Sequence, residues 1–176
     1  MIDYSELKNL PALTKSRTIV RFQDCDPLQH LNNIKYFDYF FNAREDQIAQ
    51  LYRFNATEVF KILKAGWVIY HHEISYVRPA NVGEWVRIFS RLIFYNNDTI
   101  VVEYFMTDDT GKQLKTLLWS TMKYIDVTTG KLSKHQESIK AYLDATADKS
   151  VNFEATDFFK RVREVKKEVA SFELVD

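Results

Sequence analysis

The chain has 176 residues and a mass of 20.8 kDa, which fits one domain better than two. Apolar side chains make up 46% of the sequence, enough for a sizeable core, and 24 basic residues balance 24 acidic ones. This composition excludes an intrinsically disordered chain, which needs low hydrophobicity and unbalanced charge. It also lacks the excess of positive charge that is typical of a nucleic-acid-binding protein.

Cysteine content and hydropathy indicate the compartment. The single cysteine, Cys25, allows no intrachain disulfide, which favours a reducing compartment. The stretch from Met1 to Asn9 carries acidic residues and no long apolar run, so it predicts no signal peptide. No stretch approaches the roughly 18 uninterrupted apolar residues that would span a membrane. We therefore expect a soluble cytoplasmic protein that binds neither membranes nor nucleic acid.

Several catalytic and cofactor-binding motifs are absent from the sequence. Only four glycines and three prolines occur, and none forms a G-x-G-x-x-G, a phosphate loop ending in G-K-[ST], or a G-x-S-x-G elbow. This excludes the usual dinucleotide folds, P-loop nucleotidases and α/β-hydrolases. No C-x-x-C or H-E-x-x-H spacing predicts a zinc site, so we expect no metal or other cofactor.

The first part of the chain predicts a strand, a polar loop and a long helix. Arg17 to Phe22 alternates in the manner of a short strand. In the polar stretch that follows, Pro27 keeps Asp26 away from helical backbone angles. Asn32 then offers an N-cap for a helix of about 20 residues, from Asn33 to near Tyr52. Apolar side chains surround the first half of this helix, so we expect it to be buried on several sides.

The middle of the chain predicts a short helix and then four strands. Asn55 and Glu58 look like a capping pair, and Gly66 is expected to end the short helix. Residues that favour strands follow, separated by turn-forming segments. The predicted strands are Trp67 to Val77, Glu84 to Tyr95, Thr99 to Thr107 and Lys112 to Val127. Short connections make the last three an antiparallel meander.

Helices are expected after the strands. Ser133 and Gln136 have the spacing of a capping box that opens a helix. In the tail, four apolar residues form a narrow stripe typical of a surface helix: Phe158, Val162, Val165 and Val169. The order of elements predicts an α+β fold in which an antiparallel sheet of about five strands wraps a long helix. We expect one domain over residues 1–146 and a helical tail, 147–176, that packs on the domain or on a partner subunit.

One segment resembles a known catalytic segment. Arg21 to Pro27, followed by His30-Leu31-Asn32-Asn33 and Tyr36, is similar to the active-site segment of hot-dog-fold thioesterases of the 4-hydroxybenzoyl-CoA thioesterase type. Ser75 to Ala80 resembles that family's second strand and turn. The resemblance covers roughly Arg17 to Val127. It implies a hot-dog fold, a homodimer or homotetramer, and metal-free hydrolysis of a thioester of coenzyme A or acyl carrier protein.

The resemblance implies catalytic roles for three residues. By position, the family's catalytic carboxylate falls on Asp26, and the helix-start amide that polarises the thioester carbonyl falls on or next to Asn33. Thioester hydrolysis needs a nucleophile or a base, and hydrogen-bond donors where the oxyanion forms, and helix starts supply free N–H groups. Whether Asp26 attacks the carbonyl or activates water stays open. His30 matches the histidine of a D-x-N-x-H-x-N-N stretch in plant-type acyl-carrier-protein thioesterases, although Leu28 replaces the first asparagine of that pattern.

Two residues are candidates for substrate binding. Tyr36 lies one turn into the predicted helix, where it could also be a core residue. Arg78 precedes Pro79 at a strand end, where it could meet a phosphate of coenzyme A or remain a solvated turn residue.

Other titratable residues favour structural roles. Asp24 suits loop capping, and Cys25 stands between two carboxylates that disfavour a thiolate. His71 and His72 point to opposite faces of a strand, so they predict no metal site. Glu45 corresponds to the helix glutamate of a second thioesterase branch, which the match at Asp26 disfavours.

The leading hypothesis is hydrolysis of an acyl or aryl thioester of coenzyme A. One alternative is hydration or dehydration of an acyl thioester, which uses an Asp and His pair in a D-x-N-P-x-H pattern that is missing here. A second is a non-catalytic module that binds acyl-CoA, and a third is an acyl-carrier-protein thioesterase.

Overall fold

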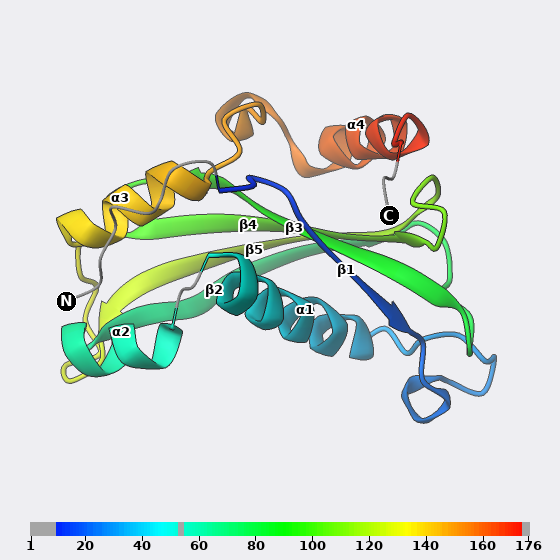
Figure 1. Cartoon of the computed structure of the whole chain (residues 1–176), viewed down its shortest axis with the longest axis horizontal. Coiled ribbons are helices and arrows are strands. Elements are labelled where there is room, and N and C mark those ends of the chain that lie inside the picture. Colours follow the sequence, from blue (N-terminus) through cyan, green and yellow to red (C-terminus); the bar gives the residue numbers. More distant parts are fainter. Residues whose placement is uncertain (1–9, 53–54, 174–176) are drawn as a thin grey trace.

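The computed structural model describes residues 10–52 and 55–173. Five strands form one antiparallel sheet in the order β1-β3-β4-β5-β2. The strands are β1 (Thr14–Ile19), β2 (Ala65–Tyr76), β3 (Trp85–Tyr95), β4 (Thr99–Asp108) and β5 (Leu114–Asp126). The α-helices are α1 (Lys35–Leu51), α2 (Ala56–Leu63), α3 (Glu137–Thr146) and α4 (Phe158–Ala170). As Figure 1 shows, α1 and α4 lie on opposite sides of the sheet. This arrangement confirms the predicted α+β fold and the β3-β4-β5 meander.

The long helix α1 buries one stripe of side chains against the sheet. Tyr36, Phe40, Ala43 and Gln47 are buried, at the three- and four-residue spacing of one helix face. The aromatic residues beside this stripe are only half-buried. The expectation that α1 is buried on several sides is therefore wrong for the single chain, because the opposite face of the helix has no layer over it among the described residues.

The ends of the first two predicted elements lie elsewhere than expected. The first strand runs over Thr14–Ile19 instead of Arg17 to Phe22, because its pairing with β3 stops at Ile19, opposite Trp85. A short 3-10 turn, η1 (Phe22–Asp24), follows. Helix α1 begins at Lys35, and the side chain of Asn32 accepts a hydrogen bond from the Ile34 amide in the turn before it.

Two predicted caps are also wrong. The short helix α2 ends at Leu63, and Lys64 makes the turn with a positive φ of 47°. Gly66 lies inside β2, paired with Ile125, so it does not end the helix. Helix α3 begins at Glu137 without a side-chain cap, because the preceding residues, including Ser133, bond to β5 and its neighbouring loop instead.

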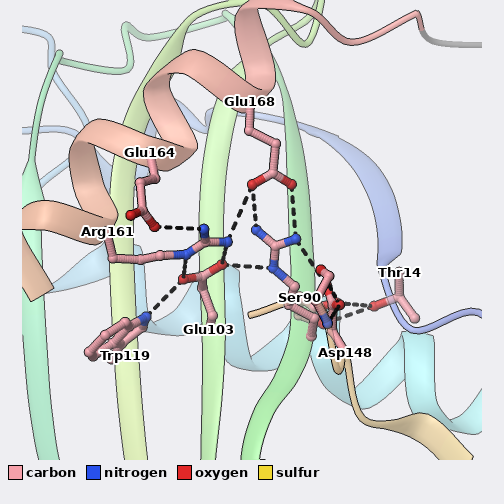
Figure 2. Close-up of polar contacts among 10 residues, drawn as sticks. Thr14, Ser90, Glu103, Trp119, Asp148, Arg161, Glu164 and Glu168 are labelled. Atoms are coloured by element: carbon pink, nitrogen blue, oxygen red, sulfur yellow. Dashed lines mark hydrogen bonds and ion pairs between the residues drawn. The ribbon is translucent and has the colours of Figure 1, made fainter. Parts of the chain in front are cut away.

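Helix α4 is held on the other face of the sheet by a buried charge network (Figure 2). Both carboxylate oxygens of Glu103, which is 0% exposed, accept hydrogen bonds from Arg161, at 2.9 and 3.1 Å. Arg91 donates to the same carboxylate at 2.7 Å and also pairs with Glu168 of α4. The Trp119 indole donates to Glu103 at 2.8 Å. Every acceptor of this buried carboxylate thus faces a donor, as burial of a charge requires.

The pKa of Glu103 reflects these contacts. Burial alone would raise this pKa, but the hydrogen bonds from Arg161 and the charges of Arg91 and Arg161 hold it below its usual value.

The buried stripe of α4 differs from the predicted one in one residue. Arg161 belongs to the buried stripe together with Phe158, Val165 and Val169, whereas Val162 of the predicted stripe is only half-buried. Contact of the tail with a partner subunit stays a prediction.

A buried histidine joins the start of the α3 segment to the sheet. His135 is 2% exposed, and its Nε2 accepts a hydrogen bond from the Trp67 indole at 3.0 Å. Its Nδ1 therefore carries the proton and donates to the Asn96 carbonyl at 2.9 Å. Burial lowers the pKa of His135 and Lys140 adds to this, while the Asn96 carbonyl and the charge of Asp98 oppose it. The ring is thus held in its neutral form.

We expect folding stability to fall as the pH drops below about 6.5. The unfolded chain takes up a proton on His135 near that pH, whereas the folded chain does so only at lower pH, so acid favours the unfolded state. His72, whose pKa burial also lowers, acts in the same direction. Urea unfolding at about pH 7.5 and about pH 5.5 measures the effect. His135→Gln does not titrate and should show a weaker pH dependence; an unchanged dependence would contradict this assignment.

Within the described residues, no helix has both the length and the hydropathy needed to cross a membrane.

Candidate active site

The loop between β1 and α1 is fastened to the turn that follows β2. The Leu31 amide donates to the Ala80 carbonyl at 2.8 Å, and the Asp26 amide donates to the His30 carbonyl at 2.8 Å. Gln29 closes the tight turn between them with a φ of 62°. These bonds place the polar segment beside the end of β2, although the two are some fifty residues apart in the chain.

Asp26 has a structural role and also a free oxygen. Its Oδ1 accepts hydrogen bonds from the amides of Leu28, at 2.9 Å, and His30, at 3.1 Å. Among the described residues, nothing donates to Oδ2. The side chain is half-buried. The turn therefore orients the carboxylate through one oxygen and leaves the other available for a ligand.

The pocket at this place has a volume of about 210 Å³. It brings together all five residues that the sequence predicts as catalytic or substrate-binding, along with four others. The lining consists of Asp26, His30, Leu31, Asn33, Tyr36, Tyr76, Val77, Arg78 and Pro79. The chain segments on either side of the pocket are the start of α1 and the end of β2. The catalytic and substrate-binding roles of these five residues stay predictions.

The turn that leads into α1 offers an unused amide to this pocket. The backbone N–H of Asn33 donates to no acceptor among the described residues, while its carbonyl accepts a hydrogen bond from the Tyr76 hydroxyl at 2.9 Å. The N–H groups at a helix start lie at the positive end of the helix dipole. An oxygen that gains negative charge in the pocket would be stabilised by such a donor.

Tyr36 forms a wall of the pocket. It is 2% exposed, and its hydroxyl accepts a hydrogen bond from the Ala80 amide at 3.2 Å. Burial raises the pKa of Tyr36, so the phenol stays neutral. Its ring packs edge-on against Tyr76, with ring centroids 5.3 Å apart. This burial confirms Tyr36 as a core residue, and its contact with substrate stays a prediction.

His30 and Arg78 supply ionisable groups without partners in the described chain. The His30 imidazole makes no hydrogen bond there, and the exposed Arg78 guanidinium forms no ion pair. Only the backbone of Arg78 is fastened, through a 3.0 Å bond from its amide to the Lys115 carbonyl. The guanidinium is thus available to an anionic group at the pocket.

The weaker candidates lie outside this pocket. The Asp24 side chain accepts a hydrogen bond from the Tyr39 hydroxyl at 3.0 Å and none from a backbone amide of the described residues. The loop-capping role predicted for Asp24 is therefore wrong, because Asp26 caps the loop instead. Burial raises the pKa of the Cys25 thiol, and the charges of Asp24 and Asp26 raise it further, which disfavours a thiolate. The His72 ring packs against Phe37 and Phe41 of α1, and its Nδ1 forms a hydrogen bond with the Ser120 hydroxyl at 3.0 Å.

The described ranges, 10–52 and 55–173, contain no group of three or more His, Cys, Asp or Glu side chains arranged to hold a metal ion. Glu45 lines a different pocket, at the middle of α1. The sequence analysis did not single out Tyr76, whose hydroxyl donates to the Asn33 carbonyl in the turn before α1. Tyr76 lies within the segment from Ser75 to Ala80 that resembles the family's second strand and turn, and this position was the signal that could have identified it.

Comparisons with known proteins agree with this fold. Residues 20–143, well over half of the chain, match the thioesterase-like superfamily. No curated protein gives a significant match. Among solved structures, YbaW, a probable thioesterase from Escherichia coli, is 22% identical with a TM-score of 0.67, over 76% of this chain and 98% of that chain. The 1,4-dihydroxy-2-naphthoyl-CoA thioesterase Slr0204 from Synechocystis is 12% identical with a TM-score of 0.67, over 79% and 98%.

A third structure, the 12:0-ACP thioesterase from Umbellularia californica, is 12% identical with a TM-score of 0.71, over 83% of this chain and 55% of that chain. At such identities the likeness concerns the fold, and it confirms the predicted hot-dog arrangement of a long helix against a five-stranded antiparallel sheet. Together with the match over residues 20–143, it leads to one conclusion: the chain belongs to the thioesterase-like superfamily.

Proposed function

We propose that this protein hydrolyses a thioester of coenzyme A to the free acid and the thiol, as an enzyme of the 4-hydroxybenzoyl-CoA thioesterase type. The observation that carries the proposal is the meeting of a half-buried carboxylate, Asp26, and an unused helix-start amide, Asn33, on one pocket. A base or nucleophile beside an oxyanion donor is what acyl transfer to water requires.

The proposed mechanism uses three groups of the pocket. The thioester carbonyl oxygen accepts a hydrogen bond from the Asn33 amide, which polarises the carbonyl. Asp26 either removes a proton from the water that attacks the carbonyl carbon or attacks that carbon itself. In both routes the C–S bond then breaks, and the departing sulfur takes a proton, for which His30 is the candidate donor. Where Asp26 is the nucleophile, this step leaves an anhydride between the acyl group and Asp26, which water hydrolyses afterwards. The acid and the thiol are the products.

The position of Arg78 favours coenzyme A as the carrier of the acyl group. Arg78 lies on the pocket without an ion pair in the described chain, and a guanidinium binds phosphate oxygens well. Coenzyme A brings phosphates to the mouth of such a pocket. The phosphopantetheine arm of an acyl carrier protein also carries one, so hydrolysis of acyl-carrier-protein thioesters is the second candidate.

The test is release of free thiol from a panel of purified thioesters. The panel includes short, medium and long acyl-CoA esters, an aromatic acyl-CoA and the matching acyl-carrier-protein esters. Hydrolysis of coenzyme A esters well above the buffer rate is expected, and the preferred ester names the substrate class. Thermal stabilisation by an acyl-CoA without turnover would favour a binding module instead, and formation of a hydroxyacyl or enoyl thioester would favour a hydratase.

We also propose that the protein is a homodimer built through β2. This strand ends the sheet, and its hydrogen-bonding edge is unpaired within the described chain. Val68, Ile69 and Tyr70 are 43%, 48% and 72% exposed along it. An exposed apolar edge strand is a template for pairing with a second copy about a two-fold axis. The candidate pocket lies at the end of this strand, so pairing would set a second subunit beside it.

Tyr70→Lys should convert the dimer into a monomer, because it places a charge on each of the two joined edges. Light scattering coupled to size-exclusion chromatography measures the mass directly. The control is Phe159→Lys on α4, which changes an aromatic residue that is similarly exposed, at 69%, and should leave the mass unchanged. A wild-type monomer, or a Tyr70→Lys variant that remains a dimer, would contradict pairing through β2.

A further inference from the structure

The outward face of α4 carries positive charge. The opposite face packs on the sheet, and the two acidic residues of the helix are engaged elsewhere: Glu168 pairs with Arg91, and Glu164 bonds to Arg161 (Figure 2). The exposed residues recur at intervals of three and four, so they share one face of the helix. These residues, which form the outer stripe of α4, are Phe159, Lys160, Arg163, Lys166, Lys167 and Ala170.

The cations of the outer stripe have little compensation within the described chain. Arg163, Lys166 and Lys167 form no ion pair with a described residue. Lys160 reaches Glu164 only at 4.0 Å. Each cation has another one three or four residues away, and like charges at these spacings repel one another. An anionic surface laid over the stripe would offset this repulsion.

The composition of the whole chain does not reveal this patch. Helix α4 has five basic and two acidic residues, whereas basic and acidic residues balance over the chain as a whole. Exposed acids stand at the two ends of the stripe, Asp157 at the N-cap and Glu173 after the last turn, so positive charge is concentrated along its middle. The expectation that no membrane is bound rested on the lack of a spanning segment, which does not bear on binding at a membrane surface.

The position of α4 favours a flat partner. The helix lies on the side of the sheet opposite to α1 (Figure 1), and the Asp26 pocket lies beside the start of α1. A carrier protein bound to the stripe would therefore not face the pocket that its acyl group has to reach. In a dimer that pairs through antiparallel β2 edges, the two-fold axis is perpendicular to the sheet, so both outer stripes lie on the same side. Two cationic stripes on one side suit an extended anionic plane.

We propose that the outer stripe of α4 binds the surface of a membrane that contains anionic lipids. The cations contact the phosphates of the lipid headgroups, and the Phe159 ring, which is 69% exposed, enters the boundary between headgroups and acyl chains. The helix lies on the membrane without crossing it. This binding site is separate from the thioester site and does not depend on hydrolysis at Asp26.

Flotation with lipid vesicles tests the proposal. At about 0.1 M salt the protein should bind vesicles of phosphatidylcholine with about 30% phosphatidylglycerol, and should bind pure phosphatidylcholine vesicles at least about tenfold more weakly. At about 0.5 M salt most of the binding to the anionic vesicles should be lost, because salt screens exposed charges.

Paired substitutions locate the binding face. Lys166→Gln combined with Lys167→Gln should lower the partition coefficient by at least about 20-fold, because each basic residue near an anionic surface contributes about fivefold. Glutamine has the helix propensity of lysine, so α4 should stay folded. The matched control is Lys131→Gln with Lys134→Gln, which removes two exposed lysines before α3 and should change binding by less than about twofold. Phe159→Ser should weaken binding by about fivefold, and Phe159→Leu should largely retain it.

Several results would overturn the proposal. They are a lack of binding to the anionic vesicles, equal binding to both kinds of vesicle, and equal losses in the two lysine double variants. Tighter binding to a double-stranded DNA fragment or to an acyl carrier protein, lost in the α4 variant, would assign the stripe to that partner instead. A changed mass of the α4 variant in solution would assign it to a subunit interface. Because no substrate is present, failure of the thioesterase assay leaves this test intact.

Discussion

Asp26→Asn should lower kcat/KM for the preferred thioester by about 10²–10⁴-fold while the protein stays folded. Asparagine keeps the oxygen that accepts the amides of Leu28 and His30, so the turn that positions the side chain survives. It loses the negative charge on the free oxygen, and with it both the base and the nucleophile. A thousandfold loss corresponds to about 4 kcal/mol of transition-state stabilisation.

The matched control is Asp24→Asn. This residue lies two positions away in the same loop, faces the Tyr39 hydroxyl instead of the pocket, and should change kcat/KM little. Thiol release under identical conditions measures both variants, with a thermal melt to confirm folding. If Asp26→Asn turned over at the wild-type rate, the assigned carboxylate would be wrong and His30 would become the next residue to test.

Glu103→Gln should destabilise the fold by about 3–5 kcal/mol, the usual cost of removing one partner from a buried ion pair. The amide has one acceptor oxygen in place of two, and its NH₂ group would face the donors of Arg91, Arg161 or Trp119. For a chain of this size the loss lowers Tm by about 6–20 °C. Because Glu103 joins the sheet to α4, detachment of that helix should accompany the loss.

Glu164→Gln provides the comparison for this network (Figure 2). Glu164 pairs with the same Arg161 at 3.3 Å, but its side chain is 40% exposed, so its removal should cost less than about 1 kcal/mol. Urea unfolding of both variants at neutral pH measures the difference. Similar losses in the two variants would show that burial of Glu103 is not what makes its ion pairs important.

Local sequence patterns predicted the elements well where one physical rule dominated. The alternation and β-branched content of the segments that became β2 to β5 indicated strands, and the actual bounds differ by only a few residues. The caps at Gly66 and Ser133 were wrong, because pairing of Gly66 with Ile125 and of Ser133 with Tyr124 outweighs the local cap preference.

The candidate site was predictable to a similar degree. Pro27 and the helix that follows place Asp26 within a short loop of the Asn33 amide, so this pair follows from nearby residues. Tyr76 and the free guanidinium of Arg78 join it through long-range hydrogen bonds, above all the bond from Leu31 to Ala80. Without the resemblance to a known motif, nothing local would have paired the two segments.

The sequence by itself thus determined the α+β class, the order of strands and helices, and the closeness of Asp26 to a helix start, because each follows from backbone preferences over a few residues. Only the tertiary structure decided the partners of Glu103, which come from β3, β5 and α4, and the packing of the Phe40 ring against those of Tyr36 and Tyr104. These contacts join residues far apart in the chain, and their formation depends on the whole sheet burying its two faces.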